Sequence, residues 1–283
     1  MTPEEFRYMR PGNLAEAVAA LAEPGAKLLS GGQSLLPLMR LRFAAPKALV
    51  DLQDVAELKG IEERGSEIRI GAFTRHVDVA ASAPWQALRE AAEQTGDRQV
   101  RRLGTIGGAV SHADPAGDLP AALLALGARV ELMGTSGRRS VPLDEFFVGP
   151  LMTAAQEDEV LESVFVPAEG KDSGSAYRKL RQEASGFALV GVAARLQFDS
   201  AGTCQAAGIG VTGVGLAPYR AGAAEEILLG TLVGDADVEK ALGAILEGVD
   251  VAADAYASAE YRSDMCRLFA KRAIEAAKSQ ARA

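Results

Sequence analysis

Residues 30–37 read Ser30-Gly31-Gly32-Gln33-Ser34-Leu35-Leu36-Pro37, and this stretch decides how the chain begins to fold. A predicted strand, residues 27–30, leads into the glycine pair, and Ser34 can cap a helix that starts at Leu35. Glycines at such a turn leave backbone N–H groups open to an anion, because no Cβ atom stands in the way. A glycine pair before a helix is more often only a turn. The stretch by itself therefore predicts a β/α unit and leaves ligand binding open.

The segments on either side complete a small strand–helix–strand unit. Asn13 and Glu16 have the spacing of a capping pair at a helix start, and apolar residues at helical spacing follow over residues 14–21. Pro37 is compatible with the second helix, because the first turn of a helix has no internal N–H donors to lose. A strand over residues 48–52 closes the unit.

A second glycine-rich stretch spans residues 103–118 and is expected to be a loop before a helix over residues 119–126. From Thr105 into the start of that helix the sequence reads Thr105-Ile106-Gly107-Gly108-Ala109-Val110-Ser111-His112-Ala113-Asp114-Pro115-Ala116-Gly117-Asp118-Leu119-Pro120. Two glycine-paired loops suggest two backbone cradles for one extended, phosphate-bearing ligand, since such loops offer N–H donors without charge. His112 is a candidate ligand contact. Asp118 can accept from ligand hydroxyl groups or cap the following helix, and the sequence leaves both roles open.

The remaining chain combines strands and helices without an evident internal repeat. The alternation of Ile68 and Ile70 predicts a strand, and the polar residues 169–174 are typical of a linker. Beyond that linker, three strands in meander order precede a helical C-terminus. The other predicted elements are helices over residues 77–81 and 86–94, a strand over 129–133, the three strands 176–180, 189–198 and 204–212, and a final helix over 262–278.

Other patterns that often mark a site carry less weight in this chain. Residues 208–213 satisfy the GxGxxG pattern, but residues 214–218 do not begin a helix where a dinucleotide pyrophosphate would need one, so a Rossmann site is not predicted. The only histidines are His76 and His112, and no GxSxG nucleophile elbow is present. His76 is expected on a helix surface. No catalytic residue is predicted.

Composition narrows the classes of function. The chain has 283 residues, 48% of them apolar, which is enough for about two domains with their own cores. The net charge is −8, with no basic stripe, so nucleic acid is not an expected partner. Cys204 and Cys266 stand far apart without a CxxC pair, so they are expected to be buried rather than to bind a metal or cluster. Early charges and the lack of an apolar run of about 18 residues predict a cytoplasmic protein without a signal peptide or transmembrane segment.

The two glycine stretches together resemble one protein family. Residues 30–37 look like its AGGxSLLP motif, and residues 105–120 look like its TIGGNxxxADPxxDLP motif. The family is that of the medium, FAD-binding subunits of molybdenum hydroxylases of the carbon monoxide dehydrogenase and xanthine dehydrogenase type. The resemblance continues through residues 70–74 and 176–179, so it covers nearly the whole chain.

The resemblance implies an α+β fold, in which a two-subdomain FAD-binding fold of the vanillyl-alcohol-oxidase type precedes a C-terminal domain of antiparallel sheet and helices. The expected boundaries are residues 1–54 and 55–170 for the FAD-binding subdomains and 171–283 for the C-terminal domain. In the family both loops hold the pyrophosphate and ribityl region of FAD, the residue matching Asp118 contacts the cofactor, and the residue matching Lys179 lies near the flavin. The expected FAD contacts are Ser30, Gly31, Gly32, Gln33, Ser34, Leu35, Thr105, Ile106, Gly107, Gly108, His112, Asp114, Asp118, Val160 and Lys179.

Three positions depart from the family pattern. Ala109 stands where the family usually has Asn, Ser30 where Ala is common, and Gly186 where an Asp often follows the Tyr-x-Lys segment. Loss of the Asn side chain removes one potential ligand hydrogen bond, worth about 0.5–1.5 kcal/mol net. Weaker FAD binding is therefore expected, with the backbone amides still available.

The resemblance also implies partners. They are a large molybdopterin-binding subunit, a small subunit with [2Fe-2S] clusters and an external electron acceptor, so the chain would be the electron-transfer subunit of a heterotrimer. One alternative is a self-sufficient flavin oxidase of the vanillyl-alcohol-oxidase group, which would need its own substrate pocket and base. Another is a scaffold subunit without flavin, which the departures at Ala109 and Gly186 make conceivable.

Overall fold

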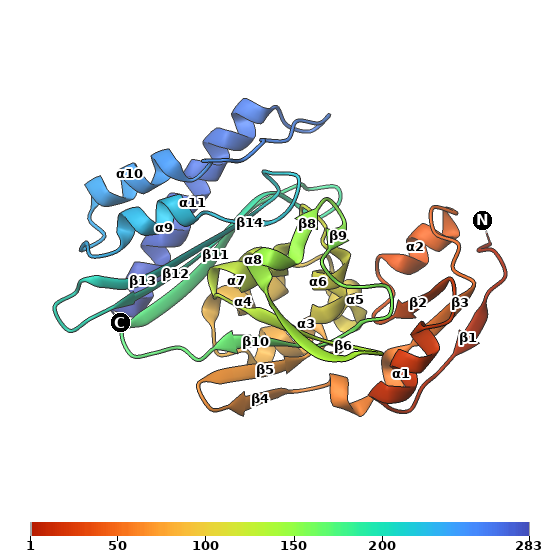
Figure 1. The fold of residues 1–283 in the computed structure, drawn as a ribbon. Helices are drawn as coiled ribbons and strands as arrows, with labels where there is room; N and C mark the ends of the chain where they lie inside the picture. The colour runs from red at the N-terminus through yellow and green to blue at the C-terminus, as the bar shows by residue number, and fades with distance from the viewer. Residues whose placement is uncertain (1, 283) are drawn as a thin grey trace.

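The computed structural model describes residues 2–282, which form three main β-sheets in succession along the chain. A small N-terminal unit lies at one end of the molecule, a five-stranded sheet with its helices occupies the middle, and a four-stranded sheet with the last helices forms the other end (Figure 1). The first sheet is parallel and the other two are antiparallel. This mixed architecture agrees with the α+β fold expected from the sequence.

The N-terminal unit is a three-stranded sheet with two connecting helices. Its elements are β1 (Arg7–Met9), α1 (Leu14–Leu21), β2 (Ala26–Leu29), α2 (Leu35–Arg40) and β3 (Ala48–Asp51), followed by the 3-10 turns η1 (Leu52–Asp54) and η2 (Ala56–Leu58). The strand order is β1-β3-β2. Asn13 caps α1 by accepting a hydrogen bond from the Glu16 backbone N at 2.9 Å, which confirms the predicted capping pair. Ser34 is the N-cap residue of α2, which begins at Leu35 as predicted, but within the described chain its side chain makes no capping hydrogen bond.

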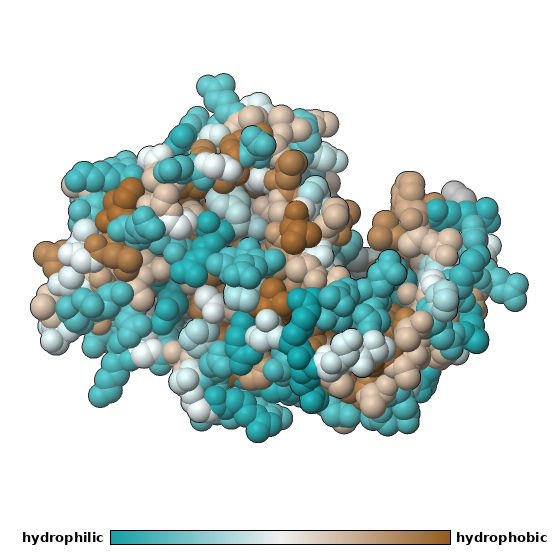
Figure 2. All heavy atoms as spheres, viewed as in Figure 1, coloured by the Kyte–Doolittle hydropathy of each residue, from teal (hydrophilic) through white to brown (hydrophobic). Residues whose placement is uncertain are grey.

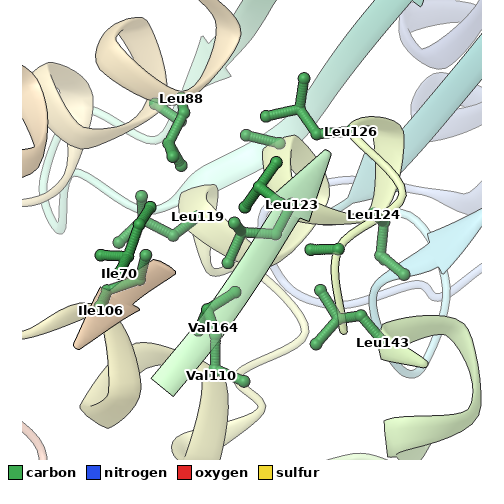
Figure 3. Close-up of a cluster of buried hydrophobic side chains, with 14 of the residues drawn as sticks. Ile70, Leu88, Ile106, Val110, Leu119, Leu123, Leu124, Leu126, Leu143 and Val164 are labelled. Carbon is green, nitrogen blue, oxygen red and sulfur yellow. The ribbon is translucent and has the colours of Figure 1, made fainter. Parts of the chain in front are cut away.

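The middle of the molecule is a five-stranded antiparallel sheet with helices packed on it. Its elements are β4 (Ile61–Arg64), β5 (Glu67–Gly71), α3 (His76–Ser82), α4 (Gln86–Gln94), α5 (Arg98–Leu103), α6 (Ile106–His112), α7 (Asp118–Ala125), β6 (Arg129–Gly134), β7 (Gly137–Pro142), α8 (Leu143–Phe146), β8 (Phe147–Gly149), β9 (Met152–Thr153) and β10 (Val160–Pro167). The order β4-β5-β10-β6-β7 places the last strand of this region at the centre of the sheet, and β8 and β9 form a separate ribbon. Leu119 and Leu123 of α7 share a buried cluster with Leu88 of α4 and the sheet residues Ile70 and Val164 (Figure 3).

The C-terminal region is an antiparallel sheet covered by helices; the three strands predicted in meander order are present, and a short fourth strand, which was not predicted, extends the sheet. Its elements are β11 (Ser173–Arg181), β12 (Ala188–Phe198), β13 (Cys204–Thr212), β14 (Tyr219–Arg220), α9 (Gly222–Leu228), α10 (Asp235–Ala244) and α11 (Ala259–Ala281). Cys204 and Cys266 are both buried, as expected. Gly208 and Gly210 of the GxGxxG pattern lie against α7, and a Cβ atom at either would stand 2.0 Å from a carbonyl oxygen of that helix. These glycines therefore allow close packing of a helix on a strand.

One local prediction in the middle region is wrong. Residues 103–118 were expected to form a loop, but α6 lies inside this stretch and has Gly107 and Gly108 in its first turn. Glycine disfavours a helix interior by about 1 kcal/mol relative to alanine, which is why the pattern reads as a loop. The helix forms because Thr105 caps it and because Ile106 and Val110 are fully buried. The preceding short helix, α5, was not predicted.

Candidate functional site

The first glycine loop, residues 30–34, joins β2 to α2 along a backbone path that needs glycine. Gly32 has a φ of +71°, in the left-handed region that side-chain-bearing residues rarely adopt. At Gly31, a Cβ atom would lie 2.1 Å from the carbonyl oxygen of Leu103. The side chain of Gln33 folds back, and its Nε2 donates to the Gly31 carbonyl oxygen at 2.9 Å. The loop is thus a tight turn in contact with α5.

The second loop is seated on the segment that follows β5. The Thr105 side chain accepts from the Gly108 backbone N at 3.1 Å, and the Gly107 backbone N donates to the Ala72 carbonyl oxygen at 2.9 Å. A Cβ atom at Gly107 would lie 2.5 Å from the Cβ of Ala72, so α6 approaches this segment more closely than any other residue would allow. Residues 70–74, part of the family resemblance, therefore position the second loop.

The structure brings the two loops into direct contact. Ser30 Oγ and Thr105 Oγ1 are 2.7 Å apart, although the residues are 75 positions apart in the chain. Gly31 meets the backbone of Leu103 and Gly104 on the same side. We call the joined residues 30–34 and 104–108 the glycine cradle. The sequence predicted two cradles for one ligand; the structure places the two loops side by side, and their binding of a ligand stays a prediction.

His76 supports the glycine cradle from inside the protein, and its predicted place on a helix surface is wrong. Its side chain is 4% exposed, and its backbone N donates to the Gly104 carbonyl oxygen at 3.0 Å. Within residues 2–282 its Nδ1 has no hydrogen-bond partner. Burial, and secondarily the charge of Arg101, lower the pKa of His76 to about 4, so the ring is neutral at physiological pH. The sequence does contain a signal for this burial, because His76 and Val79 are three residues apart and therefore lie on the same, buried face of α3.

A buried charge network lies where α7 begins. Asp118 Oδ1 accepts from the Tyr177 hydroxyl at 2.6 Å and from Lys179 Nζ at 2.8 Å. Lys179 Nζ also donates to the carbonyl oxygens of Gln94 at 3.0 Å and Gly186 at 2.7 Å, so its three protons have acceptors. Burial raises the pKa of Asp118 and lowers that of Lys179, while the attraction between the two opposite charges counters both effects.

This network bears on the two roles considered for Asp118. Gly117, not Asp118, is the N-cap of α7, and Asp118 is the first helical residue, so the capping role is wrong. The Asp118 side chain is 4% exposed, and protein groups already donate to its carboxylate. Its contact with FAD stays a prediction. Tyr177, which lies within the family-like stretch 176–179 and had no predicted role, also belongs to the network, and nothing local in the sequence pairs it with a residue of α7.

Gly186, one of the departures, has a defined structural role. Its φ of +77° lies in the left-handed region, and its carbonyl oxygen is an acceptor for Lys179. It sits in the turn between β11 and β12, where Gln182 accepts from the Gly186 backbone N at 2.8 Å. Glycine therefore suits this turn, and the departure leaves the buried network complete.

The remaining predicted residues lie away from the contact between Ser30 and Thr105. Val160 begins β10, pairs with Met133 and is fully buried, as a whole residue. His112 ends α6, with Nε2 3.9 Å from Asp114 Oδ2, and Asp114 Oδ1 accepts from the Ala116 backbone N at 2.9 Å. The contacts of these residues with FAD stay predictions.

A hollow lies between part of the N-terminal unit and the rest of the molecule, and Figure 2 shows hydrophobic side chains on both sides of it. In Figure 1, α2 and the β8–β9 ribbon face each other across this gap. Both segments expose large apolar side chains: Leu36, Leu41 and Phe43 in and after α2, and Val148, Leu151 and Met152 in the ribbon. The sequence did not reveal that these residues are exposed, because apolar residues on a surface follow the same local patterns as core residues.

Comparison with known proteins identifies the family. The model "FAD binding domain in molybdopterin dehydrogenase" matches residues 4–169, and "CO dehydrogenase flavoprotein C-terminal domain" matches residues 175–277. The chain belongs to this family of FAD-binding medium subunits of molybdenum hydroxylases. It is 37% identical to the carbon monoxide dehydrogenase medium chain of Afipia carboxidovorans over 100% of both chains.

Solved structures of relatives agree over almost the full length. A chain of carbon monoxide dehydrogenase from Hydrogenophaga pseudoflava superposes with a TM-score of 0.93 at 41% identity, covering 99% of both chains. A chain of quinoline 2-oxidoreductase from Pseudomonas putida 86 gives a TM-score of 0.89 at 30% identity, again covering 99% of both. The protein is thus an oxidoreductase subunit of the flavoprotein type, and FAD is its cofactor.

The glycine cradle is the part of the chain that the sequence predicts to contact this cofactor. Gly32 turns the first loop through a left-handed φ of +71°, and a Cβ atom at Gly107 of the second loop would lie 2.7 Å from the Ala72 carbonyl oxygen, so each loop has a glycine that a larger residue could replace only with strain. Within the described residues, no helix has the length and apolar character needed to cross a bilayer. In the same part of the chain, no group of three or more His, Cys, Asp or Glu side chains is placed to hold a metal ion.

Proposed function

We propose that this chain is the FAD-carrying electron-transfer subunit of a heterotrimeric molybdenum hydroxylase. It would pass electrons from the [2Fe-2S] clusters of a small partner subunit to an external acceptor. The observation that carries the proposal is the contact of Ser30 with Thr105 at 2.7 Å, which joins the two family motifs into one surface. Full-length similarity to medium subunits of such enzymes supports it.

The residues of the chain bind and orient the cofactor in this proposal. FAD, when bound, accepts electrons singly and releases them in pairs. Backbone N–H groups of the first loop of the glycine cradle, residues 31–34, would hold its pyrophosphate without a positive side chain, because in the second loop those of Gly107 and Gly108 already donate to protein oxygens. The apolar walls near α2 and the β8–β9 ribbon would shield its ring from water. We propose that FAD also contacts the other residues predicted from the family resemblance, among them His112, Asp114, Asp118, Val160 and Lys179.

We also propose the subdivision into residues 1–54, 55–170 and 171–283. The three main sheets support it, because each falls within one of these ranges. The third range is joined tightly to the second, since the Pro115 carbonyl oxygen accepts from the Gly213 backbone N at 2.6 Å and from Thr212 Oγ1 at 2.7 Å. Relative motion at this junction is therefore expected to be small.

The choice of substrate is assigned to the large partner subunit. Relatives with the same fold belong to enzymes named for carbon monoxide and for quinoline, so this fold serves different substrates. The medium subunit would then be a common electron outlet. The external electron acceptor would reoxidise the flavin at the hollow between α2 and the β8–β9 ribbon.

The test uses the chain alone, reconstituted with FAD under anaerobic conditions. We expect a yellow protein whose flavin keeps its colour when purines, aldehydes, N-heterocycles or carbon monoxide are added. After reduction with dithionite and removal of the reductant, the flavin should be reoxidised by an artificial quinone. Bleaching by an organic substrate without partners would identify a self-sufficient oxidase, and a chain that binds no FAD would identify a scaffold.

A further inference from the structure

The hydroxyl groups of Ser30 and Thr105 form a hydrogen bond in which either oxygen can be the donor. Their oxygens are 2.7 Å apart. Thr105 Oγ1 also accepts from the Gly108 backbone N at 3.1 Å. The pair carries two hydroxyl protons, and only one can lie between the two oxygens. The second proton is therefore left for another acceptor.

Burial decides which hydroxyl keeps that proton. Thr105 is 1% exposed, whereas Ser30 is only partly buried. If Ser30 donated, the Thr105 proton would be buried without an acceptor, because within the described chain Thr105 Oγ1 has Ser30 and Gly108 as its hydrogen-bond partners. A buried unsatisfied donor is costly. If Thr105 donates, its oxygen is satisfied, and the free proton lies on the accessible Ser30.

The free proton lies inside the glycine cradle. Ser30 directly precedes Gly31, and the Cβ position of Gly108 is 3.9 Å from the Ser30 Cβ, so the hydroxyl stands between the two glycine pairs. Alanine, which is common in the family at this position, has no such donor. Ala109, one residue beyond the glycine cradle, also lacks the side-chain amide of the Asn that the family usually has at this position.

We propose that the Ser30 hydroxyl donates a hydrogen bond to a phosphate oxygen of the bound cofactor and that Thr105 is the positioning residue that orients it. This inference rests on the proposed function, because it assumes that the glycine cradle holds the FAD pyrophosphate. It adds a side-chain donor to a site otherwise built from backbone N–H groups.

The main experiment is a titration of the apo chain with FAD, followed by quenching of flavin fluorescence. We expect Ser30→Ala to weaken binding about 3- to 10-fold, the loss typical of one net hydrogen bond. Ser30→Thr keeps the hydroxyl and should stay within about twofold of wild type, since the donor is retained. Thr105→Ser keeps the positioning donor and should also bind normally, whereas Thr105→Val should weaken binding. Ser200→Ala, in the exposed turn between β12 and β13, is the matched control.

Two further readouts distinguish a phosphate contact from a general loosening of the loops. Ser30→Ala should weaken binding of ADP, which carries a pyrophosphate, and leave binding of riboflavin unchanged. The ³¹P NMR signals of bound FAD should also shift in Ser30→Ala but not in Ser200→Ala. Equal losses for ADP and riboflavin, or a Ser30→Ala chain with wild-type FAD affinity, would overturn the inference and leave the proposed function standing. A wild-type chain that binds no FAD would overturn both.

Discussion

A single methyl group at Gly31 tests whether the two loops must touch. The added Cβ atom of Gly31→Ala would lie 2.1 Å from the Leu103 carbonyl oxygen and 2.7 Å from the Gly104 Cα. These are backbone atoms, so no side chain can rotate away. An ordinary contact of 3.4 Å requires the loops to separate by about 1.3 Å. A separation of that size would also break the 2.7 Å bond between Ser30 and Thr105.

The expected magnitudes follow from this displacement. Overpacking of this kind costs about 1–3 kcal/mol, so we expect the free energy of unfolding of the apo chain, measured by urea denaturation, to fall by about 2 kcal/mol. FAD affinity should fall more than about tenfold, because the lost hydrogen bond and the widened glycine cradle both reduce it. Gly243→Ala is the matched control. Gly243 is exposed in α10, its Cβ position has nothing within 4 Å, and alanine there should stabilise the helix by up to about 1 kcal/mol. A Gly31→Ala chain with wild-type stability and FAD affinity would refute the reasoning.

Three further predictions concern the buried groups and the cofactor linkage. The pKa of His76 falls from 6.5 to about 4 on folding, because the buried ring resists protonation. The unfolded chain therefore binds a proton more readily between these pH values, and the free energy of unfolding should decrease by up to about 3 kcal/mol as the pH falls from 6.5 to about 4. His76→Leu should flatten the pH dependence of the urea midpoint in that window, and an unchanged slope would contradict the assignment. Lys179→Met should destabilise the chain by about 3–5 kcal/mol in urea denaturation, because it leaves the Asp118 carboxylate buried without a cation. Combining it with Asp118→Asn should recover part of that loss, and a double variant no more stable than Lys179→Met would argue against the pair. Acid precipitation should release all the flavin into the supernatant, since the glycine cradle binds through hydrogen bonds, and a yellow pellet would show a covalent link instead.

The elements with strong local signals could be predicted from the sequence. The capping pair Asn13 and Glu16 gives the start of α1, and alternating apolar residues give the meander β11–β12–β13. The helix α6 could not be predicted in this way. Its first turn contains Gly107 and Gly108, and it is stabilised by tertiary packing against Ala72, which no local pattern shows.

For the candidate site, the sequence located the glycine loops but not the contacts between them. The bond between Ser30 and Thr105 joins residues 75 positions apart, and its existence depends on where β2 and α6 lie in space. The same holds for Asp118, which either of two roles could explain until Lys179 and Tyr177 appeared beside it. The residue types indicated which chemistry is available, but the hydrogen-bond partner of each polar group could be identified only from the folded structure.

The helix α7 shows that the cofactor-binding half and the C-terminal half depend on each other. All of its residues, from Asp118 to Ala125, are buried, because the helix lies between the middle region and the strands β12 and β13. Gly208 and Gly210 bring β13 within backbone contact of this helix, and Lys179 of β11 supplies the cation for Asp118. Without the C-terminal region, one face of α7 would be bare and Asp118 would lose its ion-pair partner. The C-terminal region therefore completes the interior of the cofactor-binding half, whichever surface it also offers to a partner subunit.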